Sequence, residues 1–283
     1  MKINKQKIFK KKHVFFLAPS IIGIIIFILI PFLDSFRRSF LSSGSGTFVG
    51  LKNYSVTIKN EAFILAVKNT CLFTAVCIPI LLFLSFFIAY ILSKRNHIKV
   101  LKSMMLFPMA VPTAVLVMVW RILFCDAGYI NSFVTKSGHE SIEFLSTSKV
   151  FWLLVGSYIW KNLGYTILLW MAGISGVSAS AIEAAGIDGA NEKDILLHII
   201  IPDLKPTFYT ITIISFLNSF KVFREAYLVA GAYPDDSIYL LQHLFNNWFL
   251  KLDLDKMAAA AVMVFSVIFV VIVILQRIWD RED

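Results

Sequence analysis

The sequence predicts an all-α membrane protein with six transmembrane helices. Hydrophobic residues make up 58% of the 283 residues, whereas charged residues make up only 16%. The mean hydropathy is +0.76. The apolar residues are gathered in blocks of roughly 20, the length that a helix needs to cross the hydrocarbon core of a bilayer. A soluble domain of this length would carry more charge and fewer phenylalanines, which argues against a soluble fold with a large core.

The N-terminal segment is strongly basic. Residues 1–13 contain six lysines and directly precede an apolar run. This placement indicates a cytoplasmic flank held against anionic lipid, and it argues against nucleic acid as the partner of a chain whose formal net charge is +9. The run at 14–33 begins like a signal peptide, but it is long and has no small-residue cleavage site at its end. We predict a retained first transmembrane helix, followed by an extracytoplasmic segment over 34–66.

Five further apolar spans form a predicted core over residues 67–276. They cover residues 69–92, 104–124, 150–173, 207–228 and 257–276. Pro108 and Pro112 remove backbone hydrogen bonds from the span at 104–124, so we expect this span to be irregular and packed against its neighbours. Six spans place both termini on one side of the membrane. Lys and Arg are more frequent in the segments on the N-terminal side, so we predict that residues 1–13 and 277–283 are cytoplasmic.

The polar interruption between the fourth and fifth spans, Glu183–Pro206, falls on the cytoplasmic side by the same rule. Ser180 is the predicted N-cap of a short helix over 181–188. Gly189 then permits a turn that a residue with a Cβ atom would strain. Asn191 is the predicted cap of a second helix, with Asp194 in a capping-box position.

The second helix of this loop has an apolar stripe, made by Ile195, Leu196, Ile199 and Ile200. We predict that Pro202 ends the helix and that Pro206 begins the next span, where its missing N–H costs little. Two interpretations fit this helix-turn-helix: it docks into a cleft of a cytoplasmic partner, or it lies on the lipid surface. The excess of acidic over basic residues in the loop disfavours anionic lipid.

The motif in this loop resembles the EAA signature of permease subunits of ATP-binding-cassette importers. The matching residues are Glu183-Ala184-Ala185, Asp188-Gly189-Ala190, Ile201-Pro202 and Pro206. Nearly the whole chain resembles the sugar-type, maltose-permease-like branch, through Phe48–Tyr54, Asn69-Thr70, Trp120-Arg121, Trp160–Tyr165 and Phe220–Phe223. The stretch Gly231-Ala232-Tyr233-Pro234 departs from the Gly-rich sequence that the family often has there.

The resemblance implies a MetI-like permease core with an extra N-terminal helix, in the cell membrane. The expected partners are a second permease subunit in a heterodimer, two cytoplasmic ATPase subunits and an extracytoplasmic solute-binding protein. Glu183, Ala184, Ala185, Asp188, Gly189, Ala190, Pro202 and Pro206 would form the loop that couples to the ATPase. The implied substrate is a sugar or oligosaccharide, with glycerol-phosphate or another polyol as the alternative. Neither a cofactor nor a metal is expected.

The chain has no G-x-x-x-x-G-K-[ST] motif, so it cannot bind ATP in the P-loop manner and is not expected to be an enzyme. Gly173-Ile174-Ser175-Gly176 matches the motif of intramembrane serine proteases. However, all five histidines lie outside the apolar spans, so no imidazole base is expected beside Ser175 within the membrane. A secondary transporter is the other alternative, but Glu225 is the single acidic residue inside the predicted spans.

Polar residues inside predicted spans are candidates for a transport path. Lys161 lies near the middle of the fourth span, and Asn218 and Lys221 lie in the fifth. Glu225 follows Lys221 by four residues, a spacing that allows the two to pair. The alternative is that the charged residues of the fifth span extend to the outer interface and have no role in transport.

Overall fold

The computed structural model describes residues 17–95 and 99–280. The predicted basic N-terminus at 1–13 and the start of the first predicted span lie outside the described residues. Within them, the regular elements are helices, and the one bridge of β type is an isolated contact between Leu41 and Phe48. The all-α prediction is therefore confirmed. The chain forms two compact units, Met1–Asn60 with Asn247–Val271, and Glu61–Asn246 with Ile272–Asp283.

The first unit contains a long apolar helix near the N-terminus, Leu17–Arg38. It includes the π-turn η1 (Ile25–Leu29) and the helix α2 (Ile30–Arg38). No residue of its most apolar window is buried by the rest of the chain, as expected for a helix that faces lipid. The unit also holds α3 (Lys52–Ile58) and most of α16 (Leu254–Asp280). The Phe32 and Phe265 rings lie 4.6 Å apart, so α2 and α16 pack together inside this unit.

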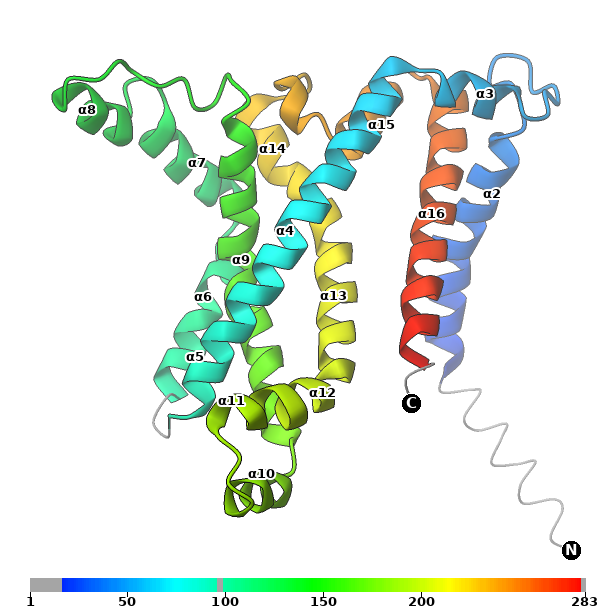
Figure 1. Cartoon of the computed structure of the whole chain (residues 1–283). Helices are drawn as coiled ribbons and strands as arrows, with labels where there is room; N and C mark the ends of the chain where they lie inside the picture. Colours follow the sequence, from blue (N-terminus) through cyan, green and yellow to red (C-terminus); the bar gives the residue numbers. More distant parts are fainter. Residues whose placement is uncertain (1–16, 96–98, 281–283) are drawn as a thin grey trace, which may run out of the picture. The chain divides into compact units, whose positions relative to one another are not determined.

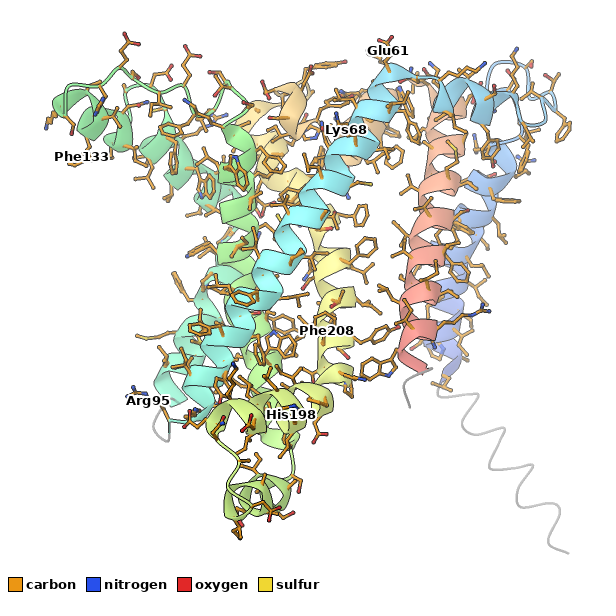
Figure 2. All side chains as sticks on the ribbon, in the orientation of Figure 1. Glu61, Lys68, Arg95, Phe133, His198 and Phe208 are labelled. Carbon is orange, nitrogen blue, oxygen red and sulfur yellow. The ribbon has the colours of Figure 1, made fainter. Side chains whose placement is uncertain are left out.

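The second unit is built on two long helices, α4 (Glu61–Ser93) and α9 (Val150–Gly176), which pack along each other. The helix α13 (Lys205–Ser219) packs against both, and Figure 1 shows the three together. Figure 2 shows Glu61 and Arg95 at opposite ends of α4. After α13 come a 3-10 turn η3 (Phe220–Val222), α14 (Phe223–Ala230), η4 (Asp236–Ile238) and α15 (Leu241–Leu250), which reaches the boundary between the units.

The prolines break the segment between α4 and α9, as predicted. The predicted span at 104–124 is divided among α5 (Lys99–Met105), α6 (Phe107–Ala110) and α7 (Thr113–Phe124), and α8 (Tyr129–Lys136) follows. Pro108 lies in the first turn of α6 and Pro112 is the N-cap of α7. Both prolines occupy positions where a helix lacks a partner for the N–H in any case.

Two clusters of buried apolar side chains hold the second unit together. One joins Phe73, Leu81 and Tyr158 to residues of α14 and η4. The other joins Trp170, Ile200 and Ile211 near the opposite end of α9. The backbones of α9 and α5 approach closely at Gly164, where an added Cβ atom would collide with the carbonyl oxygen of Met105. Glycine at this position therefore sets the spacing between these two helices.

Among the described residues, four helices are long and apolar enough to cross a membrane, and up to six are if each of two bent helix pairs forms one span. The bent pairs are Val150–Gly176 with Ala179–Ile187, and Glu192–Asp203 with Lys205–Ala230. The chain is therefore a multi-pass membrane protein. Its number of spans, its orientation and the domain limits stay predictions.

Candidate functional site

The first candidate site is the helix-turn-helix between α9 and α13, residues 178–206, which we call the coupling loop. Its first helix is α10 (Ala179–Ile187). The Oγ atom of Ser178 accepts a hydrogen bond from the Ala181 N–H at 3.3 Å, so Ser178 is the N-cap. The predicted cap, Ser180, was wrong by two residues, because the backbone is already extended at Val177 and Ser178 and the helix starts earlier.

The turn after α10 depends on Gly189, as predicted. Its φ is +87°, in the left-handed region that favours glycine. The N–H of Ala190 donates to the Ala185 carbonyl at 2.9 Å, and the N–H of Gly189 donates to that of Gly186 at 3.2 Å. These bonds close the end of α10 in the manner of a Schellman motif. Because no other residue lies within 4 Å of an added Cβ atom, the requirement for glycine is conformational.

The second helix of the coupling loop begins with the predicted capping box. The Oδ1 atom of Asn191 accepts from the backbone N–H groups of Lys193 and Asp194 at 2.9 and 3.0 Å, and Asp194 accepts from the Asn191 N–H at 3.3 Å. The helix runs through α11 (Glu192–Ile195), η2 (Leu196–Ile200) and α12 (Ile201–Asp203). This box fixes where the chain turns back toward the membrane-spanning helices.

Pro202 does not end the second helix, contrary to the prediction. The π-turn η2 precedes it, with the Ile201 N–H bonded to the Leu196 carbonyl, and the helix continues to Asp203. The wider π-turn gives the proline ring room. The helix bends by 63° at Leu204 before α13 begins. Pro206 lies in the first turn of α13, as predicted.

The bend at Leu204 is tightly packed. Leu204 is 2% exposed. It lies against Gly173 of α9, where an added Cβ atom would collide with Thr207 Oγ1 and lie 2.8 Å from a methyl group of Leu204. Ile200 and Leu204 belong to the same apolar cluster as Trp170 and Ile211. The second helix of the coupling loop is therefore joined to the membrane-spanning helices by buried apolar contacts.

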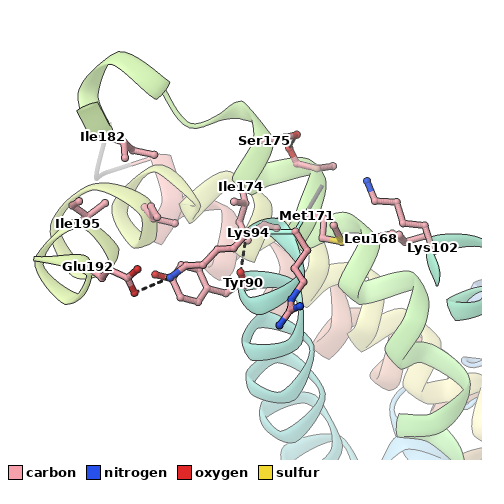
Figure 3. A pocket seen from close by; sticks show the side chains of 14 residues that line it. Tyr90, Lys94, Lys102, Leu168, Met171, Ile174, Ser175, Ile182, Glu192 and Ile195 are labelled. Atoms are coloured by element: carbon pink, nitrogen blue, oxygen red, sulfur yellow. Dashed lines mark hydrogen bonds and ion pairs between the residues drawn. The ribbon is translucent and has the colours of Figure 1, made fainter. Parts of the chain in front are cut away.

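An ion pair also ties the coupling loop to the end of α4. The Nζ atom of Lys94 lies 2.8 Å from Glu192 Oε2 and 4.6 Å from the centre of the Tyr90 ring. The hydrogen bond to Glu192 raises the pKa of Lys94. Lys94 and Glu192 line an open pocket of about 750 Å³, together with Arg95, Lys102 and Ser175, and Figure 3 shows this pocket from close by.

The outer face of α10 is open. None of its residues is buried, and Ile187 is 86% exposed. Glu183, Ala184, Asp188 and Gly189 are exposed, while Ala185 and Ala190 are half-buried. Figure 1 shows α10 beyond the ends of α4, α9 and α13, and Figure 2 places His198 at the end of this unit that also holds Arg95. Ile187 was not among the predicted residues of the loop. Its apolar side chain, between Glu183–Ala185 and Asp188–Ala190, was the sequence signal that could have identified it as part of the exposed face.

The three predicted path residues meet in a second candidate site, a polar cavity of about 160 Å³. Lys161 Nζ lies 2.7 Å from Glu225 Oε1 and donates to Thr113 Oγ1 at 2.9 Å. Lys221 Nζ donates to Asn218 Oδ1 at 2.9 Å. Asn218 in turn donates to Asn162 Oδ1 at 3.3 Å. We call this site the polar cavity.

Glu225 pairs with Lys161 and not with Lys221, so the pairing that the four-residue spacing allows within the fifth span is not formed. The 3-10 turn Phe220–Val222 lies between α13 and α14 and contains Lys221, so the four-residue spacing of a continuous α-helix does not apply. The side chain of Glu225 is 8% exposed and that of Lys161 is 25% exposed. Thr113, Asn162 and Arg224 also line the cavity. Sequence reasoning gave the first two no role.

Ser175 shows no sign of activation as a nucleophile. Its Oγ donates to the Ala172 carbonyl at 2.8 Å, one turn back in the same helix. Across the described residues, no group of three or more His, Cys, Asp or Glu side chains is placed to hold a metal ion.

Comparisons with known proteins agree with this geometry. The family described as "Binding-protein-dependent transport system inner membrane component" matches residues 82–282. The chain is 30% identical over 267 residues to the arabinooligosaccharides transport system permease protein AraP of Bacillus subtilis (strain 168), covering 90% of this chain and 84% of that protein. It is 28% identical over 288 residues to the probable starch degradation products transport system permease protein AmyD of Thermoanaerobacterium thermosulfurigenes, covering 99% and 98%.

A solved structure has the same fold. It is the crystal structure of a bacterial ABC transporter involved in the import of the acidic polysaccharide alginate. The TM-score is 0.84 at 18% identity, over 98% of this chain and 99% of that one. The resemblance found in the sequence is thus confirmed, and the chain belongs to the family of binding-protein-dependent transport system inner membrane components.

Proposed function

We propose that this chain is the permease subunit of an ATP-binding-cassette importer and that it moves a sugar or oligosaccharide into the cytoplasm. The observation that carries the proposal is the coupling loop: an exposed short helix, a left-handed Gly189 and a second helix packed against the membrane-spanning helices. The names of the relatives from Bacillus subtilis and Thermoanaerobacterium thermosulfurigenes support the substrate class.

The missing P-loop motif and the small volume of the polar cavity indicate which partner subunits the chain needs. Since the sequence has no P-loop motif, two separate cytoplasmic ATPase subunits supply the energy. An extracytoplasmic binding protein delivers the solute. The polar cavity, at about 160 Å³, is smaller than the roughly 300–1,000 Å³ of a typical ligand pocket. A second permease subunit, different from this one, supplies the rest of the wall.

The proposed mechanism is alternating access. The ATPase dimer closes on ATP and moves α10, whose open face carries Glu183, Ala184 and Ile187. The second helix passes the movement to α13 through the packed bend at Leu204. The helix pairs then rock so that the polar cavity, with Lys161, Asn218 and Lys221, opens first outward and then inward.

The test uses the transporter with its native partner subunits, purified through a tag on this chain and reconstituted in liposomes with its binding protein. Uptake is measured over a panel of labelled neutral and acidic oligosaccharides, which includes arabino-, malto- and galacto-oligosaccharides. We expect uptake of at least one sugar to require ATP and to persist when an uncoupler collapses the proton gradient. Uptake that needs no ATPase subunit and stops with the uncoupler would overturn the proposal in favour of a secondary transporter.

Gly189 provides the variant that tests the coupling loop. A side chain with a Cβ atom at positive φ costs about 1–2 kcal/mol, and more for a β-branched residue. We expect Gly189→Val to abolish ATP-driven uptake while membrane insertion stays normal, and Gly189→Asn to retain part of it. Gly138 is the matched control, because its φ is +82° and its surroundings are equally open, but it follows α8. Wild-type uptake in Gly189→Val, or equal losses in Gly138→Val, would contradict the coupling role.

A further inference from the structure

The polar cavity contains more positive than negative charge. Three cationic side chains line it, those of Lys161, Lys221 and Arg224, against the single carboxylate of Glu225. The formal net charge of its lining is therefore +2. Lys161 is the cation that Glu225 neutralises, at 2.7 Å. This leaves the charges of Lys221 and Arg224 to be balanced by something else.

Neither of these two cations is paired with a carboxylate of the described residues. The ammonium group of Lys221 has only the amide oxygen of Asn218 as its hydrogen-bond acceptor there, at 2.9 Å. Both side chains are exposed and line the cavity. Charged side chains within a membrane protein are costly and mark substrate or ion pathways, and Arg and Lys side chains line pores that select anions. Their donors match the oxygen atoms of a carboxylate or a phosphate.

The remaining lining suits a sugar. Asn162 and Asn218 bring amide groups that can donate to and accept from hydroxyl groups, and Tyr158 lies beside them. The amide groups are half-buried, so a bound hydroxyl would replace water at them. One wall thus offers hydroxyl recognition and, next to it, two cations.

From this charge pattern we infer that the transported solute is an acidic sugar, one that carries a carboxylate or a phosphate group, and that Lys221 and Arg224 bind the acidic group. This inference rests on the proposed function and narrows its substrate class. Lys161 and Glu225 hold each other and fix the position of α14 against α9, so they shape the cavity without adding to its net charge.

The experiment uses the same reconstituted transporter and compares matched pairs of solutes. One pair is an oligogalacturonide and a galacto-oligosaccharide of equal length, which tests a carboxylate. The other is a phosphorylated disaccharide and the same disaccharide without its phosphate group, which tests a phosphate. We expect ATP-dependent uptake of the acidic member of one pair to exceed that of its neutral member at least tenfold. The pair that shows this preference identifies the acidic group.

The variants Lys221→Gln and Arg224→Gln then test the cavity itself. Each variant removes a cationic hydrogen-bond donor to the acidic group, so it should lower uptake of the acidic solute about tenfold or more and lower uptake of the neutral member by a much smaller factor. Lys136→Gln removes an exposed cation of α8 that does not line the cavity, and it should have no effect.

Three results would overturn the inference. The first is that the wild-type transporter prefers the neutral member of both pairs. In that case the proposed function stands and only the acidic substrate class is wrong. The second is that the double variant Lys221→Gln/Arg224→Gln takes up the acidic solute at the wild-type rate. The third is that the second permease no longer co-purifies with the double variant, which would mean that Lys221 and Arg224 pair with that subunit. If the transporter takes up none of the solutes when ATP is present, the proposed function is contradicted as well.

Discussion

The ion pair between Lys161 and Glu225 makes a prediction about stability that the distances allow us to work out. Two unit charges 2.7 Å apart attract each other by roughly 6 kcal/mol at an effective dielectric constant of 20, and desolvation of both groups offsets much of this. Changing Glu225 to Gln keeps the shape but leaves the Lys161 charge without its partner. Breaking a buried pair in this way costs about 3–5 kcal/mol.

We expect the low end of that range, about 3 kcal/mol, because Lys161 is 25% exposed and keeps its hydrogen bond to Thr113. At roughly 2–4 °C per kcal/mol for a chain of this size, Glu225→Gln should lower the unfolding temperature by about 6–12 °C. The measurement is thermal unfolding of the purified transporter in detergent, followed by tryptophan fluorescence at fixed protein concentration.

The double variant Lys161→Met/Glu225→Gln distinguishes this reasoning from a general packing defect. With both charges gone, no uncompensated ion remains, so the double variant should recover most of the loss seen in Glu225→Gln. Additive losses, within about 0.5 kcal/mol, would show that the two side chains do not interact and would refute the account of the pair.

Two further predictions concern residues away from the polar cavity. Gly164→Ala should separate α9 from α5, because its Cβ atom would collide with the Met105 carbonyl, and should cost about 1–3 kcal/mol as an overpacked site; Gly156→Ala in the same helix, where the space is open, is the control in the same unfolding assay. His243 is fully buried, and burial lowers its pKa to about 4. Since the unfolded chain takes up the proton near pH 6.5, His243 contributes its full stability above that pH and loses about 3 kcal/mol as the pH falls toward 4. The loss should be absent in His243→Phe, and an unchanged slope of stability against pH in that variant would contradict the assignment.

Local patterns predicted local structure well. The capping box at Asn191 and Asp194, the turn at Gly189 and the irregular segment at Pro108 and Pro112 were all predicted and are confirmed. Each depends on residues no more than four positions apart, whose physical requirements can be read without knowing the fold.

Where the sequence reasoning was wrong, it lacked information about neighbouring turns. Pro202 was predicted to end a helix, but a π-turn precedes it, as another precedes Pro31, and the helix continues to Asp203. The spacing allowed Lys221 to pair with Glu225, but the 3-10 turn that contains Lys221 separates α13 from α14. The actual partner, Lys161, is 64 positions away. Such a pair depends on how α9 packs against α14, which no local pattern contains.

In the proposed mechanism, the packed bend at Leu204 lets the second helix of the coupling loop act as a lever. The arm, Glu192–Asp203, is a helix of roughly 18 Å at 1.5 Å per residue, and its fulcrum is the buried contact of Leu204 with Gly173. A rotation of about 10° at the fulcrum would displace the far end of the arm by roughly 3 Å. Because the contact between Leu204 and Gly173 leaves little free space, a rotation of Glu192–Asp203 would turn α13 as well. In the proposed mechanism, the absence of a side chain at Gly173 thus determines how efficiently a small displacement outside the membrane becomes a rotation within it.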